Sequence, residues 1–339
     1  MRQTVTMIIF LLLFRGLLIA DTNSGSVTLS GHTTREIEIL RDSNFRCFIR
    51  VLAQIEENYE RLGKVDRKKI LCGALRGVTK FGLEDKYADF IPAEDEATEY
   101  RKSVDGEIQT TEGAVVEDIT VGWLDIKNKI CLINIVKFRG VTTTQFDRCV
   151  VDMIKDRPEG LVLDLRGNGG GGIAIVADIL CYLMNQDCLI ATEEWNNGQK
   201  NKLYPWREGP YRFRKNAIIP RGFEFLREVP IVVLVDGDTA SAGEMMAVAL
   251  RDNSRAILVG TKTFGKSIFQ ERISSKIGSL KMTTGRWLTP KSVFIHGKGI
   301  IPDHVVGDTR GNGANPPIDA QLEKALEILS EKTKKAKGR

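Results

Sequence analysis

One serine in the C-terminal half of the sequence is placed like a nucleophile, and a lysine and a glutamine follow it. Ser241 lies in the segment TASAGE, between a strongly apolar run and a predicted helix, whose first N–H groups could bind a developing oxyanion. Lys266 follows 25 residues later, and Gln270 comes four residues after the lysine. A lysine acts as a general base only when its amine is neutral, which requires a poorly hydrated site without an adjacent carboxylate.

The same residues also allow structural interpretations, which stay open at this point. Ser241 and Glu244 form the S-x-x-E pattern of a helix capping box. Lys266 could be a surface lysine on an edge strand. On a strand, the even spacing would place Lys266 and Gln270 on one side, so that Gln270 could orient the amine without adding a charge. Glu271 would oppose a neutral lysine if it pointed inward.

Two glycine-rich segments match nucleotide-binding patterns. Residues 167–172 (GNGGGG) satisfy G-x-G-x-x-G, but so many glycines match almost any glycine template, and a tight strand-to-helix turn explains them equally well. Residues 260–267 satisfy the Walker A pattern. A phosphate loop must open a helix, whereas the residues after Ser267 have strand patterning. Nucleotide binding is therefore the weaker alternative.

The elements that must position these residues alternate between strands and helices. Strands are expected around a turn at 127–129 and at 160–165, 231–235, 256–260 and on both sides of Gly278; helices are expected at 144–155, 173–184 and after Ser241. This alternation predicts an α/β core with a largely parallel sheet. The polar stretch from Glu193 to Arg227 has little periodicity and is expected to be a surface excursion.

The N-terminal third is organised differently. Residues 1–20 combine a basic start with a short apolar run broken by Arg15, which predicts a cleaved secretory signal peptide, with an uncleaved anchor as the alternative. A polar leader and a helical segment with two apolar stripes are expected over 21–105. The core is expected over 106–308, and a C-terminal helix with a basic tail over 309–339.

Composition limits the protein class. The 339 residues are 42% hydrophobic and 27% charged, which excludes a disordered or fibrous chain. The net charge of +5 is spread along the sequence, so a nucleic-acid partner is not expected. Six cysteines exclude a disulfide-dense scaffold, and three histidines without a CxxC or HExxH pair predict no metal site. Cys181 and Cys188 are expected to be unpaired.

Four segments, in this order, resemble the carboxy-terminal processing (tail-specific) protease family. They are GLVLDLRGNGGGG, VDGDTASAGE, GTKTFGKSIFQ and TTGRWLTPKSVFIHGKGIIPDHVV, within a resemblance that extends from about Ile70 to Ala325. The resemblance implies a ClpP/crotonase-like core, with Ser241 as nucleophile, Lys266 as general base and Gln270 assisting it. It implies protein or peptide substrates and no cofactor.

The resemblance also implies an oxyanion hole. One donor would be the N–H of Ala242, and the other would come from the glycine turn, by position Gly170, with Gly169 and Gly171 as alternatives. Gly169 stands where the family commonly has proline. The span from Gly106 to Gly122 is far shorter than the roughly 50 residues that a domain needs, so we expect a form without the family's PDZ module.

The sequence therefore predicts an exported serine endopeptidase, secreted or periplasmic, with no stable membrane span after signal removal. Hydrolysis would proceed through an acyl-enzyme on Ser241. The oligomeric state is left open. The alternatives are a non-catalytic ligand-binding relative of the same fold, a nucleotide-binding enzyme, and a serine–histidine arrangement that uses His296 or His304.

Overall fold

The computed structural model divides the chain into two compact units, residues 1–78 and 79–339, which are described separately. The described residues are 51, 67–77, 79–80, 85–95, 118–125, 129–205, 220–275, 278–310 and 319–337. Outside these residues lie the expected signal peptide, the polar leader, nearly all of the first apolar stripe, and most of the 106–122 span on which the expectation of a form without a PDZ module rests. In the first unit, helix α4 (Arg67–Gly77) carries the second predicted stripe.

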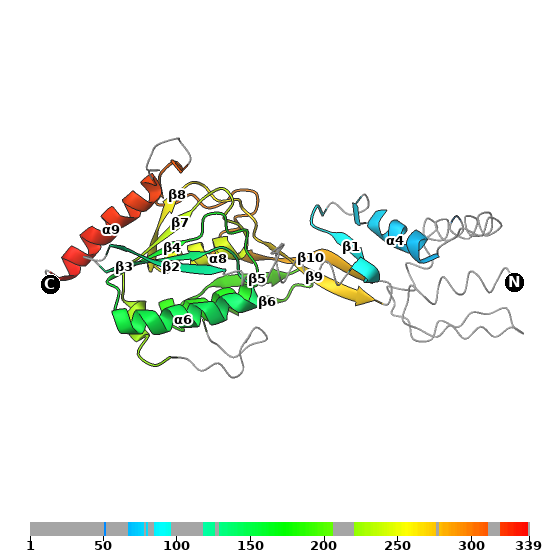
Figure 1. The fold of residues 1–339 in the computed structure, drawn as a ribbon. Coiled ribbons are helices and arrows are strands. Elements are labelled where there is room, and N and C mark those ends of the chain that lie inside the picture. Colours follow the sequence, from blue (N-terminus) through cyan, green and yellow to red (C-terminus); the bar gives the residue numbers. More distant parts are fainter. Residues whose placement is uncertain are drawn as a thin grey trace, which may run out of the picture. The chain divides into compact units, whose positions relative to one another are not determined.

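A six-stranded sheet forms the centre of the second unit and confirms the predicted α/β core (Figure 1). Its spatial order is β11 (His304–Val305), β8 (Ala256–Gly260), β7 (Ile231–Val235), β4 (Gly160–Asp164), β3 (Ile130–Ile135) and β2 (Ile119–Asp125). Neighbouring strands are parallel from β11 to β3, and only β2 pairs antiparallel, with β3. The carboxyl ends of β4 and β7 therefore lie side by side, as a shared site requires.

Helices cover both faces of this sheet. The helices are α6 (Gly140–Asp156), α7 (Ile173–Leu183), α8 (Ala242–Asp252) and α9 (Ala320–Lys337). Val232 and Leu234 of β7 pack in the cluster beneath α9, whereas the alternate residues of β7 pack in the larger cluster with α6, α7 and α8. Figure 1 shows α9 and α6 on opposite sides of the sheet. Burial on both faces explains why β7 is the continuous apolar run IVVLV.

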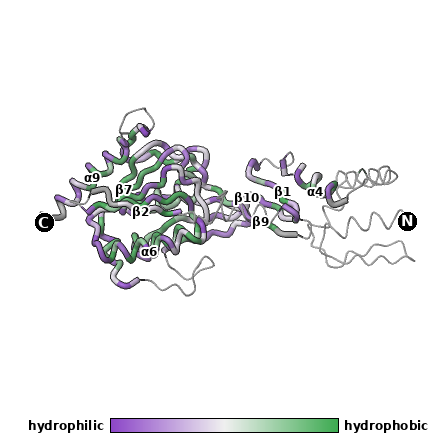
Figure 2. The backbone as a smooth tube through the Cα atoms, in the orientation of Figure 1, coloured by the Kyte–Doolittle hydropathy of each residue, from purple (hydrophilic) through white to green (hydrophobic). Residues whose placement is uncertain are grey.

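Hydropathy follows the same layers. In Figure 2 the hydrophobic colour gathers on the strands between α9 and α6, and hydrophilic stretches lie on the outside. Within the described residues, no helix is both long enough and apolar enough to cross a bilayer.

A second, antiparallel sheet adjoins the predicted site. It contains β1 (Asp89–Pro92), β10 (Gly278–Leu288), β5 (Ala191–Trp195) and β6 (Lys200–Leu203), and β9 (Ile268–Ser275) pairs along β10. The expectation of an irregular excursion from Glu193 to Arg227 is wrong at its start, because β5 and β6 form a hairpin with Glu193 buried. A short 3-10 helix, η2 (Glu224–Arg227), ends this stretch.

The helix α7 ends at Leu183, and the chain then turns before Cys188. No disulfide joins Cys181 to Cys188 in the described part of the chain. Cys181 is buried in the core, where a small apolar side chain suffices.

Candidate active site

Ser241 occupies a strained turn between β7 and α8. It is the N-cap residue of α8, with φ 55° and ψ −116°. This combination of a positive φ with a strongly negative ψ lies outside the favoured left-handed region, and a side chain with a Cβ adopts it only where the surrounding structure enforces it. A serine at a sharp strand-to-helix turn is also the arrangement of the nucleophile elbow in α/β-hydrolases. The strain is an observation that the sequence pattern did not provide.

One buried carboxylate connects the serine with the lysine segment. The Oε2 atom of Glu244 accepts the N–H of Ser241 at 3.0 Å and the N–H of Lys266 at 2.7 Å. Its Oε1 atom accepts the N–H of Gly265 at 2.7 Å and the hydroxyl of Thr263. Glu244 is fully buried. Because one oxygen accepts both amides, the backbones of Ser241 and Lys266 are direct neighbours, although 25 residues separate them in sequence.

Lys266 is half-buried and lies against an aromatic ring. Its Nζ atom is 4.6 Å from the centroid of the Tyr87 ring. Burial holds the pKa of Lys266 below its ordinary value, with Lys281 and Lys86 acting in the same direction and Asp85 opposing them. Among the described residues there is no hydrogen bond between the Lys266 amine and the Ser241 hydroxyl. Catalytic hydrogen bonds are often long before substrate binds.

Gln270 lies on β9, opposite Thr283 of β10. Its Nε2 atom is buried and has no hydrogen-bond partner in the described part of the chain. Lys266 precedes the first residue of β9, so the expectation that both side chains lie on one strand is corrected. The contacts with Glu244 and the positive φ of Gly265, 88°, hold Lys266 in a loop instead.

The glycine turn packs directly against Ser241. A Cβ atom on Gly170 would lie 2.8 Å from the Cβ of Ser241 and 3.0 Å from the amide nitrogen of Ala242, so only glycine fits. Ala242 is the first residue of α8, where N–H groups have no partner within the helix. The N–H of Gly170 donates to Oδ1 of Asn168 at 2.8 Å.

Buried polar residues brace this turn. Asn168 donates to the carbonyl of Ile135 at 2.7 Å, and its own carbonyl accepts the N–H of Ala240 at 2.9 Å. Arg166 pairs with Asp164 at 2.6 Å and with Asp319, at the start of α9, at 2.9 Å. Asp164 and Arg166 therefore hold the turn.

The nucleotide-binding interpretations do not fit. After Ser267 the chain enters β9 rather than a helix, so residues 260–267 lack the helix N-terminus that binds phosphate. Residues 167–172 do join β4 to α7, but protein atoms crowd the turn at Gly170 and Gly171. A Cβ on Gly171 would lie 2.1 Å from the carbonyl oxygen of Phe138. No described group of three or more acidic, histidine or cysteine side chains is placed to hold a metal ion.

His296 borders the environment of Lys266, whereas His304 lies on β11, beside β8. The His296 ring packs edge-on to Tyr87 at 6.2 Å between centroids and stacks on Phe294 at 5.9 Å. Burial lowers the pKa of His296, and Lys86 and Lys266 lower it further. Sequence reasoning missed Tyr87, which lies in no motif, and assigned Glu244 only to a helix cap.

Comparison with known sequences identifies the family of the chain. The profile of peptidase family S41 matches residues 129–306. The chain is 32% identical over 213 residues to a carboxyl-terminal-processing protease of Picosynechococcus, covering 61% of this chain and 47% of that protein. It is 34% identical over 175 residues to the Synechocystis protein of the same name, covering 51% and 37% respectively. The chain thus matches less than half the length of these relatives.

Solved structures share the fold. A lipoprotein from Streptococcus agalactiae has a TM-score of 0.53 at 16% identity, covering 84% of this chain and 88% of that one. A candidate S41 protease from Bacteroides fragilis has a TM-score of 0.51 at 16% identity, covering 65% and 59%. The profile match spans more than half of the sequence and includes Ser241, Lys266 and Gln270. The chain belongs to peptidase family S41, the family of the carboxyl-terminal-processing proteases that the sequence motifs resemble.

Proposed function

We propose that this protein is a serine endopeptidase that uses Ser241 and Lys266 as a catalytic dyad. The observation that carries the proposal is the Glu244 carboxylate, which hydrogen-bonds to the amides of both residues. A capping role alone would account for the bond to Ser241, but not for the bonds to Gly265 and Lys266.

The proposed reaction follows from the chemistry of the two groups. The neutral Lys266 amine takes the proton from the Ser241 hydroxyl as the oxygen attacks the carbonyl carbon of a peptide bond. The oxyanion of the tetrahedral intermediate accepts the N–H of Ala242 and a second N–H from the glycine turn. Collapse breaks the C–N bond, and the Lys266 ammonium protonates the leaving amine. Water then hydrolyses the ester on Ser241 with Lys266 again as base.

The surroundings of Lys266 support its role as a base. Its half-burial and the neighbouring cations favour the neutral amine. Gln270 supplies a polar group without charge near the start of β9, and we propose that its unpartnered amide orients the amine or the attacking water. The second oxyanion donor is proposed at Gly170, which requires its N–H to leave Asn168; Gly169 and Gly171 are the alternatives.

The substrates are proposed to be proteins or peptides, and the site of action to be outside the cytoplasm. The proposed location outside the cytoplasm depends on residues 1–20, whose composition predicts a secretory signal.

A serine-directed fluorophosphonate probe with mass mapping tests the dyad. We expect labelling at Ser241, no labelling of Ser241→Ala, and loss of proteolysis of an unfolded protein substrate in that variant. Labelling at another serine, or proteolysis by Ser241→Ala, would contradict the assignment. A well-folded protein that neither reacts nor cleaves would instead support the non-catalytic alternative.

A further inference from the structure

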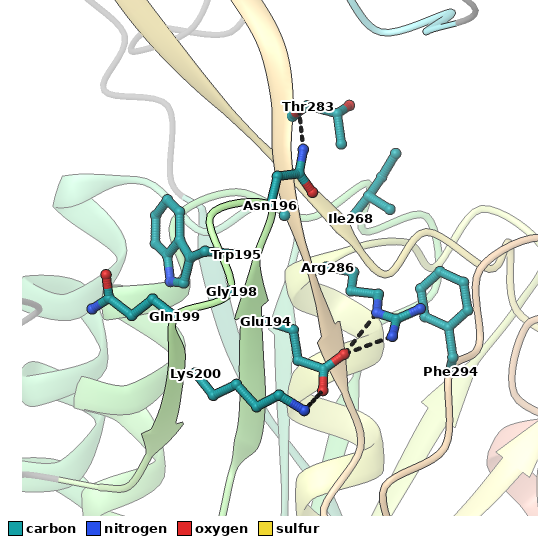
Figure 3. Close-up of a pocket in the computed structure, with 11 residues that line it drawn as sticks. Glu194, Trp195, Asn196, Gly198, Gln199, Lys200, Ile268, Thr283, Arg286 and Phe294 are labelled. Carbon is teal, nitrogen blue, oxygen red and sulfur yellow. Dashed lines mark hydrogen bonds and ion pairs between the residues drawn. The ribbon is translucent and has the colours of Figure 1, made fainter.

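A pocket of about 450 Å³ opens between the β5–β6 hairpin, the start of β9 and the end of β10 (Figure 3). This volume is within the range of small ligand-binding sites. One row of side chains crosses the three strands, because Glu194 is in register with Arg286, and Arg286 with Ile268. Phe294, Lys200 of β6 and the turn residues Asn196, Gly198 and Gln199 are also part of the walls.

The charged groups in this pocket are unbalanced. Glu194 is the only acidic residue of the lining, and it pairs with Lys200 at 2.6 Å and with Arg286 at 2.7 Å. Two cations on one carboxylate leave an excess positive charge. Both cations also remain accessible, with exposed side-chain fractions of 67% for Lys200 and 52% for Arg286.

The Arg286 guanidinium is held in place with hydrogen-bonding capacity to spare. Its Nε and Nη2 atoms face Glu194, and its plane lies over the Phe294 ring, 5.1 Å from the centroid. Within the described residues, the Nη1 atom of Arg286 makes no hydrogen bond. Fixed on one edge and stacked on one face, the group can present its remaining N–H donors to a carboxylate without losing much rotational freedom.

The pocket adjoins the proposed catalytic residues. Ile268 of the lining lies two residues after Lys266, and Thr283 of the lining is in register with Gln270. His296 stacks on Phe294 and packs against Tyr87, which covers the Lys266 amine. A polypeptide that reaches the dyad would place a nearby side chain at this pocket.

We propose that this pocket is a substrate subsite that binds an acidic side chain, with Arg286 and Lys200 contacting the carboxylate and Ile268 and Phe294 packing on its methylene groups. This inference rests on the proposed peptidase function and names the substrate preference of that site.

Internally quenched peptides test the subsite. In each peptide, one position near the cleaved bond is glutamate, glutamine or lysine, and the readout is kcat/KM. At one position we expect kcat/KM to be higher for the glutamate peptide than for the glutamine peptide, and lowest for the lysine peptide. Arg286→Gln should lower the glutamate-to-glutamine ratio about threefold, as expected for a solvent-accessible ion pair. Glu194→Gln should raise the ratio, because it frees both cations. Lys202→Gln is the matched control, on the same strand as Lys200 but outside the lining, and should leave the ratio unchanged.

The outcomes separate the two proposals. If wild-type protein cleaves the peptides without a position-specific preference for glutamate, or if both variants keep the wild-type ratio, the subsite is wrong and the peptidase function stands. If no peptide is cleaved and Ser241 resists the fluorophosphonate, both proposals fail. Thermal melting checks that each variant folds. If Arg286→Gln unfolds, Lys200→Gln replaces it and should likewise lower the glutamate-to-glutamine ratio.

Discussion

At the scale of single residues, the structure turns a capping pattern into a connection between two distant segments. Glu244 caps α8 through the amide of Ser241, and the same side chain also accepts the amides of Gly265 and Lys266. A carboxylate that accepts hydrogen bonds from both segments fixes the backbone of Ser241 relative to that of Lys266. Its contribution to the reaction would be positional, since no proposed step touches it.

Glu244→Gln should therefore reduce kcat more than it raises KM. The amide retains only one acceptor oxygen, so at least one of the N–H groups loses its partner, and small displacements of reacting groups reduce rates by about 100-fold. The measurements are steady-state kinetics and the rate of fluorophosphonate labelling at Ser241. A variant that melts at a lower temperature but labels at the wild-type rate would show that Glu244 acts only on stability.

The pH dependence of kcat/KM should report the ionisation of Lys266. The active form has the neutral amine, so activity rises as pH rises through the pKa of Lys266. Burial and the cations Lys281 and Lys86 lower that pKa, which places the rise below the ordinary value of about 10.4.

Two variants distinguish Lys266 from the histidine alternative. Lys266→Arg should abolish turnover at every pH, because a guanidinium does not deprotonate in proteins. His296→Gln should retain most activity and the same rise with pH. The reverse pattern, with activity kept by Lys266→Arg and lost with His296→Gln, would favour the serine–histidine arrangement.

At the scale of elements, the short segment 85–92 completes the environment of the base. Asp85 accepts the N–H of Thr283 on β10 at 2.8 Å and the N–H of Tyr87 at 3.0 Å, and β1 then pairs with β10. This anchoring positions the Tyr87 ring over the Lys266 amine. Among the described residues, the charged and titratable groups that act on that amine are Asp85 and Lys86 on this segment, Lys281 on β10 and His296 after β10.

Tyr87→Ala should shift the rise of kcat/KM to higher pH. Removing the ring admits water to the amine, and because burial is the largest cause of the lowered pKa of Lys266, that pKa moves back toward its ordinary value. Tyr87→Phe keeps the ring and should restore the wild-type profile. A shift to lower pH in Tyr87→Ala would show that attraction between the ammonium and the ring outweighs desolvation.

At the scale of the whole second unit, the C-terminal helix closes one face of the sheet. Leu329 of α9 is fully buried in the cluster with Val232 and Leu234. Asp319, the residue that precedes this helix, pairs with Arg166 beside the glycine turn. The helix thus contributes to the core and to the support of the site through different residues.

Leu329→Ala should lower the free energy of unfolding by about 2–5 kcal/mol, the usual effect of opening a cavity in a core. Glu331→Ala, at an exposed position of α9, should change it little. Denaturant unfolding measures the free energy of unfolding of both variants. Because Leu329 packs far along the helix from Asp319, Ser241 should label at the wild-type rate in the folded fraction of Leu329→Ala. Slower labelling would mean that the packing of α9 also controls the site.

The sequence by itself predicted a largely parallel sheet and the order of strands and helices along the chain, and the motifs shared with carboxy-terminal processing proteases indicated Ser241, Lys266 and Gln270 as candidates. These follow from local apolar periodicity and from motifs contained in short segments. Only the tertiary structure decided that Glu244 joins the two segments, that Tyr87 covers Lys266, and that residues 191–203 form a hairpin beside the site. Such contacts join residues far apart in the chain, and the side chains that make them carry no local periodicity, so their partners are set by packing alone.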